Sequence, residues 1–277
     1  MKYISPFIGT FIILAGVIAL AFEGADEFGK HEEQAAIIKE ISAIKDQLAL
    51  ECVEGFHAQV DEVRGFIQQY SKHQVSGEFQ TLWREPAKHY AAFLDVVENR
   101  REKPVAMECS TRSGLMSKLL QALGYETRIV DIYSMQKDFR AHTFLEVLNP
   151  ETKKWEIADP DINIYWFDST TQERVGISEL VANGVENYVP CSNPYRCGWD
   201  IKHNSDTNPP TELMDENYFS MARIHDSVEG KYAIYNSVNF DLEQKMPTSD
   251  GDEKVFCDVW GKVCRLGLED FSKEASP

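Results

Sequence analysis

Residues 107–161 constrain the fold of this chain more than any other stretch, because their pattern predicts one helix followed by three strands. After Cys109, leucines recur at helical spacing up to Gly124, and glycine is a common helix terminator. Three later runs rich in apolar and β-branched residues predict strands over 126–132, 142–148 and 155–158. A turn sequence, Asn-Pro-Glu-Thr, separates the last two, so they form an antiparallel hairpin. The stretch therefore predicts an α+β fold with a helix packed on an antiparallel sheet.

Three residues with reactive side chains stand at the ends of these elements. Cys109 is in the first turn of the predicted helix, where unpaired backbone N–H groups and the positive end of the helix dipole stabilise a thiolate. The same N–H groups can bind the oxyanion that forms when a carbonyl is attacked. His142 begins one arm of the hairpin and Asp159 ends the other, so both lie at one edge of the sheet. We predict a catalytic nucleophile, its base and the residue that orients the base.

A cysteine opening a helix, the segment LQALGYETRIV, the strand HTFLEV and the segment WEIADP together resemble the transglutaminase-like superfamily of papain-type thiol enzymes. The resemblance covers residues 107–164 and implies a papain-like, transglutaminase-like core. It also implies that Cys109 is the acyl-accepting nucleophile, His142 its base and Asp159 the orienter. Glu108 and the Ser-Thr pair after the cysteine depart from the residues usual in the family, which leaves the subfamily and the substrate open.

The resemblance implies thiol acyl-transfer chemistry on an amide or peptide bond of a protein or peptide substrate. Either water or an amine can resolve the acyl-enzyme, which gives a hydrolase or a protein cross-linker. The aromatic residues Trp155, Tyr165 and Trp166 and the acidic charge favour a cationic amine. An exported enzyme works where water is abundant, which favours hydrolysis, and we predict hydrolysis. A third alternative is a binding or scaffold module that keeps this fold without the chemistry.

Other side chains near this site have open roles. Asp161 is the alternative orienter if Asp159 turns away. Glu146 lies on the same face of its strand as His142, either as a buried support or as a solvated side chain. Papain-type enzymes add a side-chain oxyanion donor upstream of the cysteine, for which position alone offers Trp83, His89 and Tyr90.

The first residues predict export. From Ile4 to Phe22 the chain is almost wholly apolar, with Lys2 before it and acidic residues after it. Segment 1–24 is therefore either a cleaved signal peptide, with a small-x-small site at Ala19–Ala21, or a membrane anchor. The nineteen-residue apolar length favours the anchor. Either way the rest of the chain faces the periplasm or the extracellular side.

Residues 30–72 predict helix. An apolar seam with steps of four, three and four residues is formed by Ile37, Ile41, Ile44 and Leu48. The seam changes phase near Cys52, and Gly55 and Gly65 weaken the second half of the helix. Two interpretations stay open: a coiled-coil stalk that would make a homodimer, or a helix packed on the catalytic domain.

The rest of the chain divides into a catalytic domain over residues 75–200 and a C-terminal extension over 201–277, with late strands over 232–235 and 254–256. In an exported chain the six cysteines most simply form two local disulfides, Cys191–Cys197 and Cys257–Cys264, which leaves Cys109 free and Cys52 unexplained. The spacing of these cysteines disfavours a zinc site, and no cofactor is predicted.

The 28 basic and 45 acidic residues give a net charge of −17, which repels phosphate backbones and disfavours nucleic acid as a partner.

Overall fold

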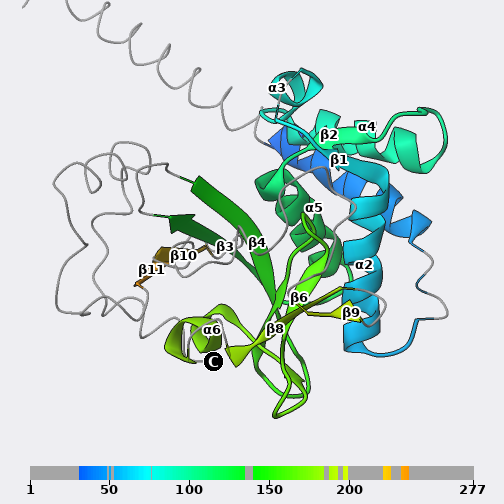
Figure 1. The fold of residues 1–277 in the computed structure, drawn as a ribbon. Coiled ribbons are helices and arrows are strands. Elements are labelled where there is room, and N and C mark those ends of the chain that lie inside the picture. The colour runs from blue at the N-terminus through cyan, green and yellow to red at the C-terminus, as the bar shows by residue number, and fades with distance from the viewer. Residues whose placement is uncertain are drawn as a thin grey trace, which may run out of the picture.

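The computed structural model describes residues 31–48, 50, 53–75, 77–134, 140–183, 187–192, 196–198, 221–225 and 232–236 (Figure 1). A helix over residues 31–47 comes first. After it come α2 (Phe56–Tyr70), β1 (Ser71–His73), α3 (Glu78–Leu82), α4 (Pro86–Val97), β2 (Val105–Met107), α5 (Cys109–Ala122), β3 (Thr127–Ser134), β4 (Arg140–Leu148), β5 (Trp155–Ala158), β6 (Ile164–Asp168), β7 (Glu173–Arg174), α6 (Ile177–Asn183), β8 (Val189–Ser192), β9 (Arg196–Cys197), β10 (Met221–His225) and β11 (Tyr232–Asn236).

The strands of the described residues form three sheets beside the helices, so the fold is α+β, as the sequence predicts. The largest sheet has the order β11-β10-β3-β4-β5, and every neighbouring pair in it is antiparallel. A second antiparallel sheet has the order β7-β6-β8-β9, and β1 and β2 form a short parallel pair. The turn after β5 leads into β6 through a single bridge between Asp159 and Ile164, so the last strand of the hairpin in the large sheet is followed directly by a strand of the second sheet.

The predicted helix and hairpin are confirmed. Helix α5 begins at Cys109, and Gly124 after its C-terminal end has a φ of 92°, a left-handed conformation that glycine adopts readily. Strands β4 and β5 pair antiparallel, with Leu145 opposite Ala158. The Asn149 side chain accepts hydrogen bonds from two backbone N–H groups in the connecting turn. Strand β4 starts two residues earlier than predicted, because its pairing with β3 continues to Arg140.

The core lies between helices and the large sheet. Helix α5 packs between α2 on one side and strands β3 and β4 on the other (Figure 1). Its apolar face is fully buried through Leu115, Met116, Leu119 and Leu120. Each such side chain contributes about 1.5–3 kcal/mol through burial, so the packing that orients α5 is strong. The end of α5 that carries the cysteine is therefore held against the sheet.

In its described residues, the segment predicted as one helical region over 30–72 contains two helices, residues 31–47 and α2, and its last two residues are in strand β1. The two helices are separated near Gly55, which precedes α2 with a φ of 89°, a conformation outside the helical region. The apolar seam of the first helix is buried in the same core as α2 and α5, through Ile41, Ile44 and Leu48. Lys45 also donates a hydrogen bond to the backbone oxygen of Ala122 at the end of α5. This seam thus lies against the domain, and the core includes residues on both sides of the boundary predicted near residue 75.

One of the two predicted disulfides is present. Cys191 and Cys197 are bonded, and they lie opposite each other on the neighbouring strands β8 and β9. The second predicted pair, Cys52, the strand predicted over 254–256 and the apolar run of residues 4–22 all lie outside the described residues. Strand β11 agrees with the one predicted over 232–235. Within the described ranges, no helix is both long and apolar enough to cross a bilayer.

Removing this disulfide is expected to lower the free energy of unfolding by about 2 kcal/mol. The two cysteines have a sequence separation of 6, so the disulfide closes a short loop. A short loop restricts the unfolded chain less than a long loop does, so the disulfide stabilises the fold by an amount at the low end of the usual range. Urea denaturation of a Cys191→Ala, Cys197→Ala double variant measures the change. A Cys109→Ala variant, which removes a thiol and keeps the bridge, is the control. Equal stability of the double variant and the wild type would contradict the expectation.

Candidate active site

The structure brings the three predicted catalytic residues together. His142 Nε2 lies 2.6 Å from Asp159 Oδ2, and both side chains are buried, with exposed fractions of 3% and 1%. The Cys109 side chain, which is partly exposed, is close enough to His142 to interact with the imidazole and raise its pKa. Because Nε2 faces the carboxylate, Nδ1 is the ring nitrogen left for the sulfur. The imidazole thus lies between a thiol and a carboxylate, in the order that general-base activation of a nucleophile requires.

Local turn geometry aims the Asp159 carboxylate at His142. Its second oxygen, Oδ1, accepts hydrogen bonds from the backbone N–H groups of Asp161 at 2.9 Å and Ile162 at 3.3 Å. An aspartate commonly bonds the backbone two residues on in such turns. These bonds occupy Oδ1 and leave Oδ2 for the imidazole, so Asp159 does not turn away and Asp161 is not needed as the orienter.

The charge of this environment favours the imidazolium form of His142. Burial by itself lowers the pKa of His142, but the charge and hydrogen bond of Asp159, together with the hydrogen bond and charge of Cys109, raise that pKa well above 6.5. A carboxylate and a thiolate on either side of the ring both stabilise the positive charge. An imidazolium beside a cysteine sulfur is the arrangement that stabilises a reactive thiolate.

Glu108 and Thr111, where the chain departs from the family pattern, form the N-terminal cap of α5. The Glu108 carboxylate accepts from the backbone of Thr111, and the Thr111 hydroxyl accepts the backbone N–H of Glu108 at 2.9 Å. This is a capping box with its acidic and hydroxyl residues exchanged. The Ser110 hydroxyl donates to the same carboxylate at 2.6 Å. The departures therefore stabilise the turn that presents the cysteine.

The sequence does not indicate the buried charged network that lies beside the triad. Arg112, one turn after the cysteine on α5, donates to Asp161 and to Ser71, and Asp161 also contacts His73. From the sequence alone, His73 would be placed on the surface or half-buried, because its spacing from the other histidines does not fit a metal site. The burial of Arg112 could not be predicted from the sequence near it, because the residues that it bonds, Ser71 and Asp161, lie 41 and 49 residues away along the chain.

The remaining predicted residues have other contacts in the described part of the chain. Glu146 is fully buried and accepts hydrogen bonds from Arg128 at 2.6 Å and from the backbone N–H at the start of α6 at 2.7 Å, so it supports the sheet. No hydrogen bond joins the three oxyanion candidates to Cys109 or His142 within those residues. Of these candidates, His89 contacts a backbone oxygen in β2, Tyr90 is buried and Trp83 is 43% exposed. The aromatic residues Tyr165 and Trp166 are buried on β6.

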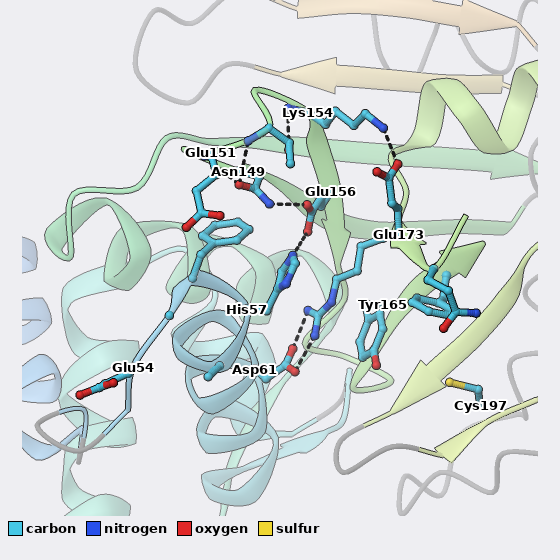
Figure 2. Close-up of a pocket in the computed structure, with 17 residues that line it drawn as sticks. Glu54, His57, Asp61, Asn149, Glu151, Lys154, Glu156, Tyr165, Glu173 and Cys197 are labelled. Atoms are coloured by element: carbon cyan, nitrogen blue, oxygen red, sulfur yellow. Dashed lines mark hydrogen bonds and ion pairs between the residues drawn. The ribbon is translucent and has the colours of Figure 1, made fainter. Parts of the chain in front are cut away.

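A separate cavity of about 690 Å³ lies at the N-terminal end of α2 (Figure 2). None of the three predicted catalytic residues lines it. His57 contacts Glu156 at 2.7 Å, and Arg174 donates two hydrogen bonds to Asp61 at 2.8 and 2.7 Å across its wall. Arg174 also stacks on Tyr165, with its guanidinium carbon 3.6 Å from the ring centroid. These charged groups pair with one another, and they hold α2 to β5 of the large sheet through Glu156 and to β7 of the second sheet through Arg174.

The site also predicts how stability depends on pH. The raised pKa of His142 gives a stabilising contribution that is full below pH 6.5 and is lost as pH rises through the folded-state value. Burial raises the pKa of Asp161, but its hydrogen bond with His73 and the positive charges of His142, His73 and Arg112 lower it below 3.8. That contribution is full above pH 3.8 and is lost as pH falls through the folded-state value.

Urea denaturation should therefore find the free energy of unfolding highest between about pH 4 and 6.5, with a decrease on each side. His142→Ala should flatten the alkaline decrease and also weaken the acid one, because the charge of His142 helps to lower the pKa of Asp161. A free energy of unfolding that increases from about pH 6.5 to pH 9 would contradict the charged His142.

Within the described residues, no group of three or more His, Cys, Asp or Glu side chains is placed to hold a metal ion. The sequence matches no family model, and no curated protein is significantly similar to it.

Proposed function

We propose that this protein is a transglutaminase-like cysteine enzyme with a papain-like core, which attacks an amide or peptide bond of a protein or peptide. The observation that carries the proposal is that His142 is hydrogen-bonded to Asp159 and lies beside Cys109, which begins helix α5. Its support from the sequence is the family resemblance of residues 107–164. The three residues lie on a helix, a strand and the end of a second strand, in that order along the chain, both in the structure and in the pattern that the sequence resembles.

The chemistry follows from the positions of these groups. The Cys109 sulfur attacks the carbonyl carbon and forms a C–S bond, and the oxyanion lies near the N–H groups at the start of α5. The tetrahedral intermediate collapses, the C–N bond breaks, and His142 gives its proton to the leaving amine. Asp159 stabilises the imidazolium before this transfer and fixes the ring orientation throughout. The product of this half-reaction is a thioester on Cys109.

Water then completes the reaction in the proposed mechanism. His142, now neutral, takes a proton from water as the oxygen attacks the thioester, and the C–S bond breaks to release a carboxylic acid. An amine acceptor would give a cross-linker instead. Incubation of candidate substrate proteins with a labelled primary amine separates the two outcomes. Cys109-dependent release of free acid that exceeds amine incorporation supports hydrolysis, and the reverse ratio would show a transferase.

Alkylation across pH tests whether the thiol is activated. Free cysteine reacts with iodoacetamide mainly above about pH 8.5, because only the thiolate attacks. We expect Cys109, identified by peptide mass spectrometry, to react rapidly near neutral pH in the folded chain. A His142→Ala variant should lose this reactivity. A wild-type pH profile equal to that of free cysteine would instead support a binding or scaffold module on the same fold.

Export is proposed on two observations, the Cys191–Cys197 disulfide and the apolar run from Ile4 to Phe22. A reporter that folds only outside the cytosol, fused after Pro277, should be active. The same fusion lacking residues 1–24 is the control and should be inactive. A second reporter, active only in the cytosol, is fused at the same position. Activity of this second reporter alone would contradict export.

A further inference from the structure

The orientation of the Asp159 carboxylate toward His142 depends on the position of the turn that follows Asp159. The N–H groups of Asp161 and Ile162 hold Oδ1 of its carboxylate. If residues 161–162 move, the carboxylate moves with them. The geometry of the Asp159–His142 hydrogen bond therefore depends on the groups that anchor Asp161.

The first anchor is Arg112. Its side chain is 2% exposed, and Nη1 donates to the backbone oxygen of Asp161 at 2.9 Å and to Oδ1 of Asp161 at 3.1 Å. Nε and Nη2 donate to the hydroxyl and the backbone oxygen of Ser71, both at 2.9 Å. The Ser71 hydroxyl in turn donates to the backbone oxygen of Ile67 at 2.6 Å. Only the rigid, planar fork of an arginine reaches all these acceptors at once.

The second anchor is His73. Its Nδ1 lies 2.8 and 3.1 Å from the two carboxylate oxygens of Asp161. His73 is in β1, opposite Met107 of β2, and Met107 lies two residues before Cys109. Both partners of Asp161 thus belong to elements adjoining the cysteine: Arg112 to α5 and His73 to the strand pair that leads into α5.

We propose that Asp161, held by Arg112 and His73, is a positioning residue that fixes the Asp159–His142 pair relative to the helix carrying Cys109. This inference rests on the function proposed above, because the network can position catalytic residues only if Cys109, His142 and Asp159 are catalytic. The network joins the two halves of the site, the nucleophile on α5 and the base on β4, through one buried carboxylate. The charge of Asp161 acts on His142 directly, so a purely structural ion pair would leave the titration of His142 unchanged only in a variant that keeps the charges, such as Arg112→Lys.

The titration of His142 tests the proposal without any substrate. The full-length chain is labelled with ¹⁵N-histidine, and the midpoint of the His142 ring signals is measured by NMR. Asp161→Asn removes both the carboxylate charge and the clamp. Arg112→Lys keeps the positive charge and loses the fork, so it separates position from charge. Asp168→Asn is the matched control, because Asp168 makes the same kind of turn on the surface, to the N–H groups of Thr170 and Thr171.

We expect the His142 midpoint to fall by about one pH unit or more in Asp161→Asn and by at least about half a unit in Arg112→Lys, with no change in Asp168→Asn. A midpoint within about 0.3 units of the wild type in folded Arg112→Lys would overturn the proposal, because a shift in Asp161→Asn alone follows from the lost charge. If Arg112→Lys does not fold, His73→Gln decides by the same criterion. The wild-type alkylation profile of Cys109 is a separate measurement, so failure of the proposed function can be told from failure of this inference.

Discussion

Replacing Cys109 with alanine is expected to reduce amide-bond cleavage by at least about 10³-fold while leaving the fold intact. The sulfur is the atom that forms the covalent bond, and no other free thiol is present among the described residues. The side chain is only partly buried, and its backbone keeps the capped first turn of α5, so stability should change little. Release of new amino groups from a peptide mixture measures the activity, and circular dichroism measures the fold.

Two further variants sharpen this prediction. Cys109→Ser should also retain little activity, because a hydroxyl is much harder to deprotonate than a thiol. Cys52→Ala removes a different thiol and should keep wild-type turnover. Full turnover in folded Cys109→Ala protein would rule out the proposed mechanism.

Changing Asp159 to asparagine is expected to lower turnover by a factor on the order of 10²–10⁴. The amide oxygen can still accept the two backbone N–H groups that hold Oδ1, so the turn should persist. The partner of His142 Nε2 becomes a neutral amide, which removes the negative charge that stabilises the imidazolium and lowers the pKa of His142. The imidazole then stabilises a thiolate less well and is free to adopt the wrong tautomer.

The rate of peptide cleavage, measured from about pH 5 to pH 9, tests this prediction. The acid-side limb of the profile should move and the maximum should fall, whereas Asp168→Asn, the same change in an exposed turn, should reproduce the wild type. A folded Asp159→Asn variant with wild-type rates at every pH would contradict the role of the carboxylate.

The parts of this site that the sequence predicts are those made by neighbouring elements. A hairpin brings its two outer ends to one edge by its own topology, so the pairing of His142 with Asp159 follows from strand lengths and one turn. The start of α5 at Cys109 follows from helical spacing and a terminating glycine. Such local patterns need no knowledge of tertiary packing.

The parts that the sequence does not predict depend on contacts between distant segments. His73 lies 88 residues from Asp161 along the chain, and only the parallel pairing of β1 with β2 brings it to the site. Arg112 gives no sign of burial, because arginine is usually exposed and its partners come from other elements. The apolar seam changes phase between the two N-terminal helices, but a change of phase alone does not show that the chain leaves the helical conformation there, as Gly55 does before α2.

Covalent trapping of an acyl group tests the central claim most directly. Full-length protein is mixed briefly with p-nitrophenyl acetate, quenched in acid, digested and mapped by mass spectrometry, in parallel with urea-unfolded protein and with His142→Ala. We predict rapid acetylation of Cys109 in the folded wild type, little in the unfolded chain and little in His142→Ala, because activation requires the assembled imidazole. Acetylation of Cys109 that is no faster in the folded protein than in the unfolded chain would contradict a nucleophile activated by His142 and Asp159.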